Sequence, residues 1–150
     1  MIIQTKVIPH GIMEIINNLT ELKAFANKFA KKLLPGSIVG LIGDLGTGKT
    51  QLTKFMVQSL GGDISEISSP TFTIINEYLI NESLKVYHFD LYRLKSIEEL
   101  EEIGYEDFFF SGNISIIEWI DNIPECIDMA TNLIKIEYLD FNSRKLTILK

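Results

Sequence analysis

Residues 43–50 read Gly43-Asp44-Leu45-Gly46-Thr47-Gly48-Lys49-Thr50, which matches the pattern G-x-x-x-x-G-K-[ST] at every fixed position. Glycines in such a loop let successive backbone N–H groups point at phosphate oxygens, and the N-terminus of the following helix adds partial positive charge. The lysine of the pattern reaches the β- and γ-phosphates, and the hydroxyl after it ligates Mg²⁺. We therefore expect this phosphate loop to bind a nucleoside triphosphate, with Lys49 on the phosphates and Thr50 on the metal.

The residues on both sides of the phosphate loop fit the same fold. Residues 37–42 (SIVGLI) form a short continuous apolar run, which is typical of a strand buried on both faces. Residues 49–60 carry apolar side chains on one side and are followed by Gly61-Gly62, which predicts an amphipathic helix with a glycine stop. A chance glycine turn would lack both neighbours.

The rest of the chain predicts further helices and strands. Apolar spacing predicts a helix from Thr20 that ends at Pro35-Gly36, and a capping box at Ser96 and Glu99 predicts a short acidic helix ending near Gly104. Strands are expected within residues 1–16 (two, split at 9–11), and at 71–80, 84–91, 114–119, 134–138 and 145–149, the last two forming a terminal hairpin. The order predicts an α/β fold: one phosphate-loop domain over residues 1–150, with a mixed, mostly parallel sheet flanked by helices.

Composition limits the class of protein. The 150 residues are 46% hydrophobic and 23% charged, as in ordinary globular proteins. No apolar run approaches the ~20 residues that a membrane-spanning helix needs, and the N-terminus lacks the order of a secretory signal. Cys126 is the only cysteine, so an intrachain disulfide is excluded. We expect a cytoplasmic protein that does not bind membranes.

The charge distribution argues against tight nucleic-acid binding by this chain alone. The net charge is −6, and of the 14 basic residues only Arg93 and Arg144 are arginines. Proteins that bind nucleic acid directly usually carry a dense basic patch that neutralises several phosphates. A nucleic acid would therefore have to be reached through a partner.

A phosphate loop needs a carboxylate that helps to hold the metal, normally at the end of a buried strand. Glu118 closes the apolar run 114–117, and Asp90 lies in the segment VYHFDLYR. A solvated carboxylate at a strand end is the alternative interpretation for either residue. Burial of the preceding apolar residues favours a functional role, because an acid beside a buried run needs a partner.

Four segments together resemble a known family. They are GDLGTGKT at 43–50, SPTFTIINEY at 69–78, YHFDLYRL at 87–94 and IIEW at 116–119, spread over about half of the chain. The first is shared by many nucleotide-binding proteins, whereas the succession of the other three is close to diagnostic. In this set and order the chain resembles the TsaE family, the small ATPases of bacterial threonylcarbamoyladenosine tRNA modification.

The resemblance implies a function and partners. It implies a single-domain phosphate-loop fold that hydrolyses ATP with Mg²⁺ and supports the TsaD–TsaB pair. That pair transfers a threonylcarbamoyl group to adenosine 37 of tRNAs that read ANN codons, so tRNA would be reached through these partners.

The resemblance also implies roles for individual residues. Lys49 would bind phosphate, Thr50 and Glu118 would hold Mg²⁺, and Asp90 would position or activate the attacking water. The further implied contacts are Thr71 as a switch residue, Trp119 near the nucleotide or a moving loop, and Thr20 with the chain just before it at the adenine. The family's usual proline after the tryptophan is Ile120 here, and residues 1–11 have no assigned role.

Three other functions use the same loop. A GTPase is disfavoured because the only Asn-Lys pair, Asn27-Lys28, precedes the loop and lacks the aspartate of the N-K-x-D segment. A kinase usually clamps its phosphates with several arginines, and two arginines leave little for that work. A nucleotide-dependent binding module remains open, because it needs the same loop as an ATPase.

The scarcity of arginine also suggests that a partner supplies an activating group, which predicts slow turnover by the chain alone.

Overall fold

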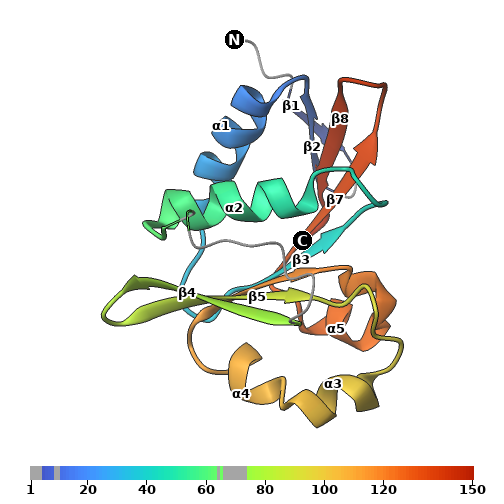
Figure 1. Ribbon diagram of the computed structural model, residues 1–150. Coiled ribbons are helices and arrows are strands. Elements are labelled where there is room, and N and C mark those ends of the chain that lie inside the picture. The colour runs from blue at the N-terminus through green and yellow to red at the C-terminus, as the bar shows by residue number, and fades with distance from the viewer. Residues whose placement is uncertain (1–4, 9–10, 64, 66–73) are drawn as a thin grey trace.

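The computed structural model describes residues 5–8, 11–63, 65 and 74–150 (Figure 1). The elements follow in the order β1 (Thr5–Ile8), β2 (Gly11–Ile16), α1 (Leu19–Ala30), β3 (Ile38–Ile42), α2 (Lys49–Leu60), β4 (Ile75–Asn81), β5 (Leu84–Asp90), α3 (Ile97–Ile103), α4 (Glu106–Phe109), β6 (Ile114–Glu118), the 3-10 turn η2 (Ile120–Asn122), α5 (Pro124–Met129), β7 (Asn132–Tyr138) and β8 (Arg144–Ile148). None of the helices in these ranges has both the length and the apolar character that crossing a membrane requires.

One mixed sheet forms the centre of the molecule, as the sequence predicts. Its eight strands lie in the order β1-β2-β8-β7-β3-β6-β5-β4. The neighbours β7, β3, β6 and β5 pair in parallel, and the remaining pairings are antiparallel. The parallel part is thus confined to the four central strands, so the sheet is mixed as predicted, but the expectation that it is mostly parallel is wrong. The hairpins at both sides need only short connections, which antiparallel pairing permits and parallel pairing does not.

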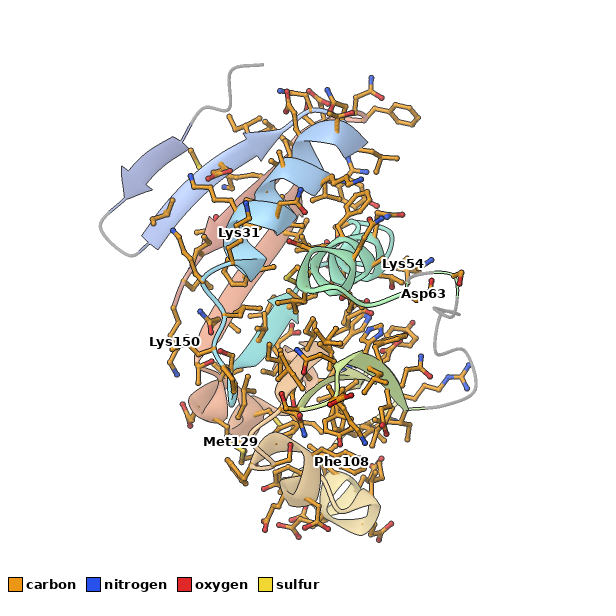
Figure 2. The ribbon with its side chains drawn as sticks, turned by 90° about the vertical axis from the view of Figure 1, so that its left-hand side faces the viewer. Lys31, Lys54, Asp63, Phe108, Met129 and Lys150 are labelled. Carbon is orange, nitrogen blue, oxygen red and sulfur yellow. The ribbon has the colours of Figure 1, made fainter. Side chains whose placement is uncertain are left out.

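Helices cover both faces of the sheet. The core on one face joins α1 and α2 to the sheet, and the core on the other face joins it to α3, α4, η2 and α5. Figure 2 shows Lys54 of α2 on one side of the β4–β5 hairpin and Phe108 of α4 on the other. The ring of Phe108 packs edge-on against Tyr87 and Phe89 of β5, with centroids 4.9 and 5.8 Å away.

Helix α1 begins one residue before its predicted start. Asn18 is the N-cap, and its side chain accepts a hydrogen bond from the backbone N–H of Glu21 at 2.9 Å. The Glu21 carboxylate in turn accepts from the N–H of Asn17 at 2.7 Å. Asparagine is a stronger N-cap than threonine, so Thr20 lies inside the first turn. The helix also ends before its predicted stop, at Ala30, and residues 31–32 and 35–36 form turns.

Other boundaries agree with the sequence or are shorter than expected. Helix α2 spans its predicted residues and is capped at its C-terminus by Gly61, whose φ of +108° suits glycine. Ser96 caps α3 as the capping box indicates. The first three residues of the strand expected at 71–80 lie outside the described residues. Helices α4 and α5 were not predicted, because four and six residues are too short to show helical periodicity.

The N-cap assignment makes a stability prediction. Asn18→Ala removes the acceptor for the N–H of Glu21, so we expect the free energy of unfolding to fall by about 1 kcal/mol. The matched variant Thr20→Ala should change it by less than about 0.5 kcal/mol, because Thr20 is exposed and alanine favours a helix. Urea denaturation monitored by circular dichroism measures both. A larger loss for Thr20→Ala than for Asn18→Ala would contradict the assignment.

Candidate active site

The candidate site lies where three parallel strands end. The phosphate loop leaves the carboxyl end of β3 and leads into α2, and β6 and then β5 lie beside β3 in the sheet. Glu118 is the Cα partner of both Leu41 and Asp90, so the ends of the three strands are level. In open α/β sheets this edge is where ligands bind.

The glycines of the phosphate loop are required for different reasons. Gly46 and Gly48 have φ values of +78° and +115°, a region that other residues rarely adopt. Gly43 instead lacks space, because a Cβ there would lie 2.6 Å from the carbonyl oxygen of Ile136. The hydroxyl of Thr47 donates to the carbonyl of Asp44 at 2.9 Å and closes the turn. The loop is therefore held in shape by its own contacts and by β7.

Lys49 carries a buried positive charge without a carboxylate partner. Its side chain is 4% exposed, and Nζ donates to the carbonyl oxygens of Gly43 at 2.5 Å and Asp44 at 2.9 Å. The amine also lies 4.1 Å from the centroid of the Trp119 ring. Burial lowers the pKa of Lys49, while nearby carboxylates, led by Glu118, act in the opposite direction. Among the ion pairs of the described residues none involves Lys49, so its charge can serve an anion.

Glu118 is fixed through both of its carboxylate oxygens. Oε1 accepts a hydrogen bond from the Thr50 hydroxyl at 2.9 Å, and Oε2 is hydrogen-bonded to Nε2 of His88. Glu118 is 3% exposed and His88 fully buried. The hydroxyl and the carboxylate thus stand side by side at the start of α2, and oxygen ligands of this kind are those that Mg²⁺ prefers.

No role is assigned to His88 from the sequence. Val86 and His88 are buried and lie two residues apart in β5, followed at the same spacing by Asp90. Alternate residues of a strand share one face of the sheet. This alternation, combined with the prediction for Asp90, could have placed the histidine on the side of the site.

Asp90 is half-buried at the end of β5. Its Oδ1 accepts a hydrogen bond from the N–H of Tyr92 at 3.0 Å. Burial raises the pKa of this carboxyl, and the neighbouring Glu118 adds to the rise, while the bond from Tyr92 opposes it. A carboxylate with a raised pKa beside a phosphate loop is suited to contact a water molecule.

Trp119 follows Glu118 in an unusual backbone conformation. Its φ is +58°, and it is the one non-glycine residue of the described chain with positive φ. Such a conformation costs an L-residue about 1–2 kcal/mol. It places the indole between Lys49 and Tyr92, whose ring centroid lies 4.9 Å away. Strain of this kind is concentrated at functional sites.

Two hollows border the phosphate loop. One of about 300 Å³ is lined by Lys49, Thr50, Asp90, Glu118 and Trp119, among others. A second, of about 620 Å³, lies beside Gly46–Gly48, α1 and the C-terminal hairpin. Both share Gly46, Gly48 and Gln51, so they meet at the loop.

The β7–β8 hairpin holds the phosphate loop from the side of the larger hollow. The hydroxyl of Tyr138 donates to the carbonyl of Leu45 at 3.0 Å, and Nε of Arg144 donates to the carbonyl of Thr47 at 3.2 Å. The guanidinium of Arg144 lies 4.3 Å from the centroid of the Tyr138 ring. The loop motif gives no indication of these contacts, because they depend on how the hairpin folds back onto it.

The structure brings most of the predicted site residues together. Asp90, Glu118 and Trp119 surround one hollow together with five loop residues: Leu45, Gly46, Gly48, Lys49 and Thr50. Thr47 lines the larger hollow instead, and Gly43 and Asp44 line neither of the two. Thr20 is exposed in the first turn of α1 and does not line the larger hollow, whereas Ile16, Asn17, Asn18 and Leu19 do. Thr71 lies outside the described residues.

Comparison with known proteins identifies the family. The family model described as "Threonylcarbamoyl adenosine biosynthesis protein TsaE" matches residues 16–146. The chain belongs to the TsaE family. The TsaE protein of Rickettsia felis is 39% identical over 137 residues, which cover 91% of this chain and 79% of that protein. The TsaE protein of Haemophilus influenzae is 42% identical over 121 residues, covering 77% of this chain and 75% of the relative.

A solved structure supports the fold of this TsaE-family chain. The crystal structure of YdiB from Bacillus subtilis matches with a TM-score of 0.69 and 28% identity, covering 99% of this chain and 86% of the other. The predicted family and the α/β fold are therefore confirmed. The match to the TsaE model begins at residue 16, so β1 and all of β2 except its last residue lie outside it.

The raised pKa of Asp90 predicts a pH-dependent gain in stability from Asp90→Asn. The folded state favours the protonated carboxyl, so the stability that protonation contributes is present below the ordinary pKa of 3.8 and is lost as the pH rises through the folded pKa. The neutral amide keeps the acceptor for Tyr92 N–H without this loss. We expect Asp90→Asn to have a larger free energy of unfolding than the wild type at pH 7. This difference between the two proteins should shrink as the pH falls toward 3.8.

Asp140→Asn is the matched control with the opposite sign. Backbone N–H groups of Asn142 and Ser143 lower the pKa of the exposed Asp140, so its charge favours the folded state above pH 3.8. Denaturation curves across this pH range should show Asp140→Asn less stable than the wild type at pH 7. A stability gap for Asp90→Asn that does not vary with pH would contradict the assignment.

Proposed function

We propose that this TsaE-family protein is a Mg²⁺-dependent ATPase that supports a TsaD–TsaB pair in forming threonylcarbamoyladenosine at position 37 of tRNAs that read ANN codons. Membership of a family of threonylcarbamoyl adenosine biosynthesis proteins supports the pathway. The observation that carries the chemistry is the hydrogen bond between Thr50 and Glu118, together with the amine of Lys49, which donates to backbone carbonyls and forms no ion pair within the described residues.

The residues present fit a magnesium–nucleotide complex. Lys49 would exchange the carbonyls of Gly43 and Asp44 for phosphate oxygens, which restores a full counter-charge to a buried cation. Thr50 and Glu118 would hold the metal through the Thr50 hydroxyl oxygen and the Glu118 Oε1, which are hydrogen-bonded to each other in the structure. Bound Mg²⁺ would neutralise charge that develops on the phosphates.

Asp90 would act on the water that attacks the terminal phosphate. It lines the same hollow as Lys49 and Thr50, and burial raises its pKa. A half-buried carboxylate of this kind can orient a water and accept its proton as the bond forms. The ring of Trp119 would stay beside the amine of Lys49.

The larger hollow is suited to the base and ribose. It adjoins the loop residues Gly46–Gly48, and Leu19 and Phe141 contribute apolar surface to its wall. Asn17 and Asn18 also line it, and an asparagine side-chain NH₂ group can donate to the ring nitrogens of a base. We propose that adenine binds here, against the start of α1.

Slow turnover by the isolated chain follows from its arginines. Arg144 already donates to the backbone carbonyls of Thr47, Asp140, Phe141 and Ser143. Arg93, the other arginine, is exposed and does not line the hollow beside Lys49. A group that stabilises the transition state would then come from a partner, as arginine fingers do in other phosphate-loop enzymes. The tRNA would be reached through the same partners, since the net charge of this chain is −6.

Phosphate release from ATP tests the proposal. We expect slow Mg²⁺-dependent release by the chain alone, and a higher rate when TsaD, TsaB and tRNA are added. Lys49→Ala and Glu118→Gln should each reduce the stimulated rate by about 10²–10³-fold, the usual loss when a transition-state contact is removed.

The outcomes separate the candidate functions. A fast rate that the partners leave unchanged would keep the ATPase but contradict its role in tRNA modification. Binding of ATP without hydrolysis under any condition would favour a nucleotide-dependent binding module, and transfer of the phosphoryl group to a small molecule would favour a kinase.

A further inference from the structure

The hydrogen bond between His88 and Glu118 concerns the carboxylate that the proposed function assigns to the metal. The two oxygens of Glu118 are held from different elements: Thr50 of α2 holds Oε1 and His88 of β5 holds Oε2. The imidazole is fully buried. It supplies the one polar contact to Oε2 among the described residues.

The strand pairing makes His88 a rigid support. β5 and β6 pair in parallel, with His88 opposite Ile116 and therefore two residues before the position of Glu118. An imidazole has only two side-chain torsions, and here it lies in a layer of buried neighbours that includes Val86, Ile114 and Ile116. A group held in this way can fix the orientation of a carboxylate to within a small angle.

Glu118 has an alternative partner close by. Lys49 is buried, has no carboxylate partner among the described residues, and lines the same hollow as Glu118, the carboxylate that acts most strongly to raise its pKa. A carboxylate free to rotate would turn toward this amine, because an ion pair relieves the burial of both charges. That rotation would remove the metal ligand and the phosphate-binding cation together.

We propose that His88 is a positioning residue: it holds Glu118 against Thr50 and away from Lys49, so that the hydroxyl and the carboxylate are set for the magnesium of the bound nucleotide. The inference rests on the proposed function, because it assumes that this pair binds the metal. In metal sites of other proteins, loss of a hydrogen-bonded support behind a ligand weakens metal affinity by about 10–100-fold.

A magnesium titration separates positioning from packing. The full chain is mixed with a fluorescent methylanthraniloyl derivative of ADP, and nucleotide binding is followed by fluorescence as MgCl₂ is added. A parallel sample that contains EDTA and no MgCl₂ gives the nucleotide affinity without metal. The magnesium midpoint is the MgCl₂ concentration at which half of the magnesium-dependent change in nucleotide fluorescence has occurred. The side chain of Asn is too short for its amide to reach Oε2, so for His88→Asn we expect this midpoint to rise about 10–100-fold. His88→Gln places an amide nitrogen near the position of Nε2 and should restore most of the response.

The control is Val86→Ala, which removes buried volume from the same face of β5 without touching Glu118. It should lower stability but leave both the magnesium midpoint and the nucleotide affinity in EDTA unchanged. His88→Asn should also bind the nucleotide more weakly in EDTA, because Glu118 would then pair with Lys49. Circular dichroism shows that each variant is folded.

Three results would overturn the inference. The first is a wild-type magnesium midpoint for His88→Asn. The second is a midpoint for His88→Gln that is raised as much as that of His88→Asn, and the third is a midpoint for Val86→Ala that is raised as much as that of His88→Asn. The first two deny the positioning contact, and the third reduces it to packing. If instead magnesium has no effect on nucleotide binding by the wild type, the metal site of the proposed function itself is contradicted.

Discussion

The hydrogen bond between the Thr50 hydroxyl and Glu118 joins the first turn of α2 to the end of β6, and the rest of the site is arranged around it. It requires β3 and β6 to run in parallel and to end level, with Leu41 opposite Glu118. It also requires a loop that curls tightly enough to begin α2 directly beside β6, which explains the glycines with positive φ. The hairpin contacts to Leu45 and Thr47 keep that loop in place.

The site concentrates buried polar groups that work against stability. Lys49, His88 and Glu118 are each less than 5% exposed, and the pKa of Asp90 is raised by burial. Such groups are costly to bury unless they are paired and hydrogen-bonded. The apolar cores on the two faces of the sheet offset this cost, since the strands that carry the site also contribute fully buried apolar side chains to both cores. A protein can retain unfavourable groups of this kind where they serve a ligand.

Much of the fold and of the site follows from local sequence. The glycine pattern, the buried run before it and the amphipathic helix after it predicted β3 and α2, and the acidic ends of two strands predicted Glu118 and Asp90. The contact of His88 with Glu118 could not be derived in the same way, because it depends on the pairing of strands that are 30 residues apart. The hydrogen bonds from Tyr138 and Arg144 to the phosphate loop could not be derived from local sequence for the same reason, because they join residues that are 93 and 97 positions apart. Asn18 was missed in favour of Thr20 because both are capping residues and only the backbone decides between them.

A crystal structure with Mg²⁺ and a non-hydrolysable ATP analogue tests the central claim most directly. The account predicts the phosphates inside the phosphate loop, with the amine of Lys49 moved from the carbonyls of Gly43 and Asp44 onto phosphate oxygens. It also predicts the metal between the hydroxyl of Thr50 and the carboxylate of Glu118, in place of their hydrogen bond. A nucleotide bound away from this loop, or a metal that contacts neither Thr50 nor Glu118, would contradict it.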